Sequence, residues 1–216
     1  MRKLVGMLGL AAMIAATPAV AQSTFTFDEG SGGLGSGEVL LASFDAGSTA
    51  GVVCGGTGCV TQTGSNGQGA DPAVGSMGDL YLSVLGGGTA TFTFAGGLSQ
   101  LGLDFGSADA YNFFDLLYAS GDTETYSGQD FITGAANGDQ SAPRTNGRLT
   151  IIADAGQSIT GLTLRSGQNS LEVDNFGAVA AVPEPATWGM MLFGFGAMGM
   201  SLRRRRRETN VLRAAV

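Results

Sequence analysis

Short runs of alternating apolar and polar residues, separated by glycine-rich turns, constrain the fold of this chain more than any other feature. The clearest case is a pair of runs, Leu80–Leu85 and Thr89–Ala95, on either side of Gly86–Gly88. In the second run Phe92 and Phe94 fall on one face and threonines fall on the other. Because successive side chains of a strand point to opposite faces, the pattern predicts a hairpin with one face toward water.

Similar runs recur along the body of the chain and predict about nine or ten strands. The body has no convincing helical periodicity, and residues 57–78 are rich in small polar residues without any period. We therefore expect an all-β fold, a single β-sandwich of jelly-roll-like form, over residues 22–181. The other predicted strands are Ser23–Phe27, Val39–Phe44, Leu101–Phe105, Phe113–Ala119, Thr123–Tyr126, Arg148–Ala153, Ile159–Leu164 and Leu171–Val179.

Residues 1–21 have the pattern of a secretory signal peptide. Two basic residues precede the apolar run Leu4–Ala16, and Ala19 and Ala21 stand at the small-residue positions that signal peptidase recognises. A first membrane anchor fits less well, because the run is short and Pro18 interrupts it. We expect signal peptidase to cleave before Gln22 and the protein to be exported.

Residues 182–207 combine a Pro-Glu-Pro turn, an uncharged apolar run and a basic run. The apolar run, Ala186–Leu202, would span about 25 Å as a helix, the lower limit for crossing a bilayer core. We expect it to form a single transmembrane helix with Trp188 at one interface. Residues 208–216 would then be a short cytoplasmic tail. The positive residues that would stop transfer are Arg203, Arg204, Arg205, Arg206 and Arg207.

This region resembles the PEP-CTERM sorting domain, in its PEP-x-x-W variety. The resemblance is carried by Pro183, Glu184, Pro185 and Trp188, followed by a Gly-Phe-Gly core and the arginine run. It implies a substrate of exosortase, a membrane-embedded cysteine protease that cuts near Pro-Glu-Pro in Gram-negative bacteria. The protein would reside in the inner membrane transiently and then reach the cell surface or the extracellular space. An ordinary C-terminal anchor would explain the apolar and basic runs but not the Pro-Glu-Pro and Trp spacing.

Charge separates the body from the targeting segments. Residues 22–182 hold sixteen acidic residues and three basic ones, Arg144, Arg148 and Arg165, a net side-chain charge of −13. Nucleic acid and anionic lipid bind cationic surfaces, so this charge argues against both as partners. It permits divalent cations and favours solubility through self-repulsion.

The two cysteines, Cys54 and Cys59, lie in the sequence CGGTGC. Export to an oxidising compartment favours a disulfide, and the glycines allow so short a ring to close. A free or redox-active pair is the alternative. A metal site would need further ligands, and the chain has no histidine.

The composition also removes the common catalytic arrangements. Without histidine there is no Ser-His-Asp or Cys-His set, and the body has no lysine for a phosphate-binding loop. A hydrolase would have to rely on paired carboxylates, as glycosidases do. Since sixteen acids bring some pair together by chance, we expect a protein that is not an enzyme.

Two ligand sites remain as hypotheses, and no other cofactor is expected. Asp28 and Asp174 would hold a structural calcium ion if the first and last strands are neighbours, and solvated strand ends are the alternative.

Asp109 and Asn112 are expected to cap a turn between two strands. Tyrosines on an exposed face would bind carbohydrate by stacking, although tyrosines at strand ends are also ordinary core or rim residues. The four are Tyr81, Tyr111, Tyr118 and Tyr126.

The sequence therefore predicts an exported surface or extracellular-matrix protein with a structural or adhesive role in the envelope, biofilm or exopolysaccharide layer. Association of the sorting family with polysaccharide production makes exopolysaccharide the candidate partner. A carbohydrate-binding module on the same sandwich is the main alternative. A carboxylate-based glycoside hydrolase and a permanently anchored inner-membrane protein are the others.

Overall fold

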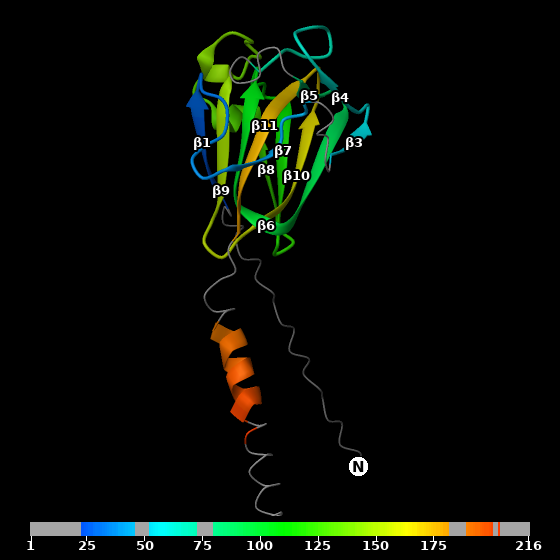
Figure 1. Cartoon of the computed structure of the whole chain (residues 1–216). Helices are drawn as coiled ribbons and strands as arrows, with labels where there is room; N and C mark the ends of the chain where they lie inside the picture. Colours follow the sequence, from blue (N-terminus) through cyan, green and yellow to red (C-terminus); the bar gives the residue numbers. More distant parts are fainter. Residues whose placement is uncertain (1–22, 46–51, 73–79, 182–188, 201–202, 204–216) are drawn as a thin grey trace, which may run out of the picture.

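The computed structural model describes residues 23–45, 52–72, 80–181, 189–200 and 203. Within these ranges the body has eleven strands and two short helices (Figure 1). The strands are β1 (Ser23–Glu29), β2 (Val39–Ala42), β3 (Val53–Gly56), β4 (Cys59–Gln62), β5 (Tyr81–Val84), β6 (Gly88–Gly106), β7 (Asn112–Tyr118), β8 (Thr123–Ser127), β9 (Gly147–Ala153), β10 (Ile159–Ser166) and β11 (Leu171–Ala180), and the helices are α1 (Gly128–Phe131) and η2 (Pro143–Thr145).

Strand β6 connects the two layers of the body. Its first half pairs with β3 and β10, and its second half pairs with β9 and β11. Between the halves, Gly96 and Gly97 have positive φ angles of 86° and 74°. Glycine adopts such angles without steric cost, so the strand bends there and continues. Two strands predicted separately, 89–95 and 101–105, are therefore parts of one strand.

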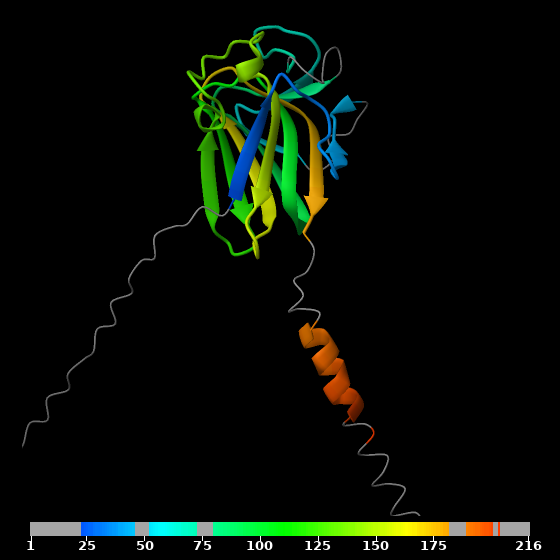
Figure 2. The same ribbon diagram turned by 90° about the vertical axis from the view of Figure 1, so that its left-hand side faces the viewer.

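The expected β-sandwich of jelly-roll-like form is corrected by this connection. All eleven strands belong to one continuous sheet, which is sandwich-like because it folds over at β6. One layer contains β1, β9, the second half of β6 and β11, which lie side by side in Figure 2. The other contains β8, β7, β10 and the first half of β6.

The core lies between these layers and is built by alternation. In β7, Phe114, Leu116 and Tyr118 are buried while the residues between them are more exposed, as the two-residue period of a strand requires. Phe105 of the facing layer packs edge-on against Phe114, with ring centroids 5.0 Å apart. Phe131 of α1 also contacts both rings and closes one end of this aromatic cluster.

The predicted hairpin over residues 80–95 is wrong. Strand β5 pairs with β4 and β11, whereas the first half of β6 pairs with β3 and β10. The connection through Gly86–Gly88 thus passes from one layer to the other instead of joining neighbours. All four residues of β5 are buried. The strand therefore has no exposed face, and its sequence does not indicate which strand pairs with it. Strand β4 also lies inside the segment 57–78 that was expected to be irregular.

The predicted transmembrane helix is also corrected. Among the described residues, no helix is both long and apolar enough to cross a membrane. Residues 189–200 are helical and exposed.

Strand register defines two ends of the body. At one end Ser23 pairs with Ala153 and Ala180 pairs with Leu98, so the first and last strands of the body both reach this proximal end. At the other end Glu29 pairs with Gly147, and Glu172 pairs with Gly106. This distal end carries the long loops and lies at the top of Figure 1.

Candidate functional site

A polar pocket of about 100 Å³ opens at the distal end of the body. We call it the distal pocket, and its lining comes from four segments, 66–69, 107–111, 138–140 and 169–172. These segments lie far apart in the sequence. Segments 107–111, 138–140 and 169–172 meet because they connect strands at the distal end of the sheet, and segment 66–69 joins them from the connection between β4 and β5. The lining groups are carboxyls, amides, hydroxyls and glycines, with Tyr111 as the one aromatic side chain among the described residues that line it.

Glu172 is the most deeply buried acid of the distal pocket, with 2% of its surface exposed. One carboxylate oxygen accepts hydrogen bonds from the Ser170 hydroxyl and from the Ala70 amide at 3.3 Å, and the other accepts from the Ser107 hydroxyl at 2.6 Å. Burial raises the pKa of Glu172, and these hydrogen bonds oppose the rise. The serines therefore fix the orientation of this carboxyl group.

Asp109 is the second acid of the distal pocket, and 9% of it is exposed. Burial raises the pKa of Asp109, while a hydrogen bond from Tyr111 opposes the rise. The pKa of Tyr111 is raised by burial and by the negative charge of Asp109. The turn predicted between Asp109 and Asn112 is closed by a backbone hydrogen bond of 3.2 Å. The Asp109 side chain bonds to Tyr111 in addition.

Asn146 organises the loops around the distal pocket, and sequence analysis did not single it out. Its side chain accepts a hydrogen bond from the backbone of Ser107 at 2.9 Å and donates to the carbonyls of Asp139 and Ala142 at 2.8 and 3.0 Å. It is buried and thus ties the loop after β6 to the loop before η2. An asparagine next to a strand gives no sequence signal for such a role.

Two glycines of the distal pocket are required by close packing. A Cβ atom on Gly138 would overlap the Asp109 carboxylate, and its φ of 63° is unfavourable for other residues. A Cβ atom on Gly69 would lie 2.8 Å from the side chains of Gln62 and Ser83. Gly67 differs, because nothing lies within 4 Å of the space that its Cβ would take.

None of the three arginines of the body lines the distal pocket. Arg165 pairs with Asp115 on the surface of β7 and β10. Arg144 donates to the Ala135 carbonyl and to the Asn137 side chain at 2.7 Å. Arg148 belongs to a separate buried cluster. The lining of the pocket, which consists only of described residues, therefore contains two acids and no basic side chain.

The cluster around Arg148 lies on the outer face of the layer formed by β6, β9 and β11. Arg148 pairs with Glu38 and with Asp104, the latter at 3.1 Å, and Asp104 also accepts from the Asn175 side chain at 2.8 Å. Burial raises the pKa of Asp104 despite these bonds. Burial would also raise the pKa of Glu38, but hydrogen bonds from Gln100, the Gly35 amide and Arg148 hold it below its ordinary value.

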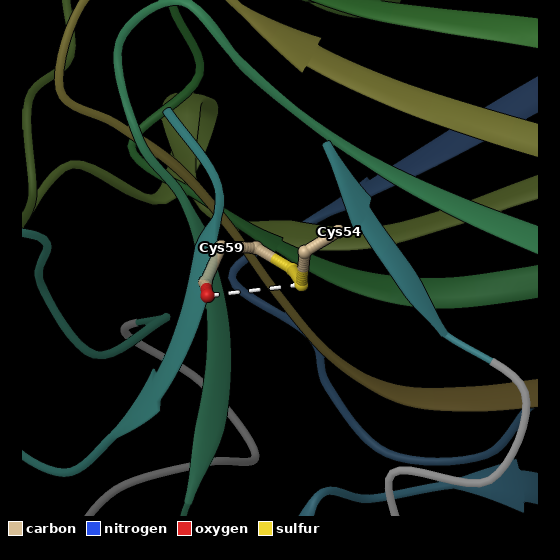
Figure 3. Close-up of a disulfide and its surroundings, with 2 residues drawn as sticks. All are labelled: Cys54 and Cys59. Atoms are coloured by element: carbon tan, nitrogen blue, oxygen red, sulfur yellow. Dashed lines mark hydrogen bonds between the residues drawn. A yellow bond between two sulfur atoms is a disulfide. The ribbon is translucent and has the colours of Figure 1, made fainter. Parts of the chain in front are cut away.

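Cys54 and Cys59 form the predicted disulfide, with Cα atoms 5.5 Å apart (Figure 3). Cys54 lies on β3, which pairs with the first half of β6, and Cys59 lies on β4, which pairs with β5. The bond therefore joins strands that pair with different parts of the sheet.

The structure does not bring Asp28 and Asp174 together. Asp28 is an exposed residue of β1, and Asp174 is a buried residue of β11. Strands β9 and β6 lie between β1 and β11, a separation of about 14 Å at the usual strand spacing. Within the described residues, no group of three or more acids or cysteines is placed to hold a metal.

The four candidate tyrosines do not form an exposed strip. Tyr81 and Tyr118 are buried in the body, and Tyr126 is partly buried against Phe25, with ring centroids 5.3 Å apart. Of the four, Tyr111 is the one that lines the distal pocket, whose lining consists of described residues.

Most of the predicted processing residues lie outside the described residues. These are Ala19, Ala21, Pro183, Glu184, Pro185, Trp188, Arg204, Arg205, Arg206 and Arg207. Arg203 is described, and it is an exposed helical residue.

The PEP-CTERM protein-sorting motif matches residues 181–207, which confirms the resemblance found from the sequence. The match defines the class of protein as exported and processed by exosortase. The chain therefore carries a PEP-CTERM sorting motif, and exosortase is the kind of processing partner that this motif implies. No protein of curated function matches the sequence.

Three solved structures show distant similarity to the body. An exo-β-1,3-galactanase from Phanerochaete chrysosporium has 18% identity over 65% of this chain, with a TM-score of 0.35. The family 11 carbohydrate-binding module of a Clostridium thermocellum cellulosomal cellulase has 14% identity over 69%, with a TM-score of 0.34. A peptidoglycan O-acetylesterase has 18% identity over 68%, with a TM-score of 0.34. This chain spans 29% of the galactanase, 98% of the module and 34% of the esterase.

Proposed function

We propose that the protein has a structural or adhesive role at the cell surface, in the envelope, biofilm or exopolysaccharide layer, and that it catalyses no reaction. The observation that carries this proposal is the position of the distal pocket. The first and last strands of the body reach the proximal end, where the sorting motif continues the chain after β11. The pocket opens at the opposite end. A body held or delivered through its proximal end presents this pocket outward.

The hydrogen bonding of Glu172 supports binding rather than hydrolysis. A glycosidase needs one carboxyl group free to donate a proton and another free to attack or to activate water. Both oxygens of Glu172 already accept hydrogen bonds from the protein, three in all. This carboxyl group is therefore better suited to the role of a fixed hydrogen-bond acceptor than to that of a catalytic carboxyl group.

Deletion of the gene in the producing cells tests the proposed role. We expect the mutant cells to retain less extracellular matrix or to adhere less, and the intact gene should restore the wild-type level. Matrix and adhesion unchanged by the deletion would contradict the proposal. A second assay incubates the processed protein with cell-derived polysaccharide, and release of reducing sugar would contradict the absence of catalysis.

A further inference from the structure

We infer that the distal pocket binds a neutral, hydroxyl-rich ligand, a single sugar ring of a polysaccharide. The inference rests on the proposed surface role and adds the ligand class and the site. It differs from stacking on a tyrosine strip, because Tyr81 and Tyr118 are buried.

The charge of the distal pocket selects against anions. Asp109 and Glu172 line it, and none of the three arginines of the body does. An anionic ligand would meet two acids in a partly desolvated site without a compensating cation, where like charges repel strongly. Uronic acids, phosphates and sulfated sugars are therefore poor ligands for this site.

The polarity of the distal pocket selects against apolar ligands. Ligand sites for apolar molecules are lined mostly by hydrophobic and aromatic side chains. Here the side chains are those of amides, serines and acids, and Tyr111 is itself hydrogen-bonded to Asp109. An apolar ligand would desolvate these groups without replacing their hydrogen bonds, which is unfavourable.

The oxygen ligands that the distal pocket offers also suit a divalent cation poorly. Calcium takes six to eight oxygen ligands, usually with several carboxylates. The distal pocket has two acids, and the oxygens of Glu172 already accept from Ser107, Ser170 and the Ala70 amide. A cation would have to displace these donors.

A sugar ring fits what remains. Sugar hydroxyls both donate and accept, and the Gln140 amide at the exposed rim can do the same. The hydroxyls of Ser107 and Ser170 already donate to Glu172, so they can accept from a sugar hydroxyl. Asn66 and Asn169 are already ordered, since Asn66 accepts from the Gln68 amide at 2.7 Å and Asn169 accepts from the Gly86 amide at 2.7 Å. A volume of about 100 Å³ holds several water molecules, a space that one ring would occupy.

Gly67 offers a direct way to block the distal pocket. Its Cβ position is open, so Gly67→Trp places an indole at the pocket without overlapping the backbone. Ser65 is an exposed residue of the same loop that does not line the pocket. Ser65→Trp is the matched control, because it adds the same side chain two residues away.

The experiment measures binding of the processed wild-type protein and both variants to immobilised neutral hexose oligosaccharides, to uronate oligosaccharides of equal length, and to calcium alone. We expect the wild type to bind at least one neutral oligosaccharide, Gly67→Trp to lower its affinity at least tenfold, and Ser65→Trp to leave it within twofold. Thermal melting checks that both variants fold.

Three outcomes would overturn the inference: no neutral oligosaccharide binds, Gly67→Trp binds as well as the wild type, or uronate or calcium binds in preference. Its failure is distinct from failure of the proposed function. Cells carrying Gly67→Trp with normal matrix and adhesion would contradict the pocket as the binding site. An unchanged deletion mutant would contradict the surface role itself.

Discussion

Arg148 and Glu38 form a buried ion pair across 110 positions of sequence. Glu38 precedes the short edge strand β2, and Arg148 lies on β9, so the pair holds the loop over residues 30–38 against the sheet. Gly102 and Gly177 pair directly beneath it, and a Cβ atom on either would overlap the two charged side chains. The cluster contains one guanidinium and two carboxylates, so its stability depends on Arg148.

Replacing Arg148 by methionine is expected to destabilise the protein by about 3–5 kcal/mol, because Glu38 and Asp104 are left buried without a cation. Arg165→Met is the control. Arg165 pairs with Asp115 at the surface with 41% of its side chain exposed, and such pairs contribute about 1 kcal/mol or less. Urea denaturation of both variants measures the difference. Equal losses would contradict the interpretation of the Arg148 cluster.

The buried acid Glu172 is expected to lower stability as pH rises. Its pKa in the folded protein is raised by burial, so the folded state keeps a proton that the unfolded chain loses from about pH 4.3 upward. Stability from this group is therefore greatest in acid and falls as pH rises through the folded pKa. Relative to Glu172→Gln, the wild type should lose stability as pH rises above about 4.3.

The Glu38→Gln variant should show the opposite pH dependence of stability in the same measurement. The pKa of Glu38 is held below its ordinary value, so its contribution is present above the unfolded pKa and is lost as pH falls. Relative to this variant, the wild type should gain stability as pH rises from about 3 to 5. If both variants change the pH profile in the same direction, the two environments have been misassigned.

The strands were predictable from the sequence, but their partners were not. Alternation located most of the strands because it reports which face of a strand is buried. It does not report which strand lies alongside, and this is why the hairpin across Gly86–Gly88 was wrong. Gly96 and Gly97 read as a break between strands, and only their positive φ angles reveal that β6 bends and continues.

The candidate site was less predictable than the fold. Asp109 was recognised only as part of a turn, and Glu172 was one of sixteen acids. They meet because β11 begins and β6 ends at the distal end, a consequence of register between strands far apart in sequence. The sorting motif was recognisable, since its residues are adjacent in the chain and need no tertiary contact. The disulfide was equally local.

Breaking the disulfide is expected to cost about 2 kcal/mol, because the six-residue ring constrains the unfolded chain. Reductant should lower the melting temperature of the wild type, and the Cys54→Ser/Cys59→Ser variant should already have the lower value. The same reductant must leave that variant unchanged. An intact mass two hydrogens above the expected value before reduction would contradict the disulfide.

Two glycine substitutions should have opposite effects. A Cβ atom on Gly88 would overlap the backbone carbonyl of Gly58, which cannot move as a side chain can, so Gly88→Ala should destabilise by about 1–3 kcal/mol or more. Gly67→Ala has open space and should be neutral or stabilise by up to about 1 kcal/mol. Thermal melting distinguishes them, and similar melting temperatures would contradict the packing around Gly88.

Replacing both Pro183 and Pro185 by alanine is expected to block processing at the sorting motif. Proline fixes its own φ angle and disfavours helix at the preceding residue, so the sequence of the wild type favours extended backbone where a protease must bind, and the alanine variant loses that preference. The variant should therefore keep its full C-terminal region, as measured by intact mass, and should be depleted from the cell surface. Thr187→Ala, within residues 181–207 but outside the Pro-Glu-Pro and Trp positions, is the control and should be processed normally. If the double variant reaches the surface with the mass of the processed wild type, the two prolines are not what exosortase reads.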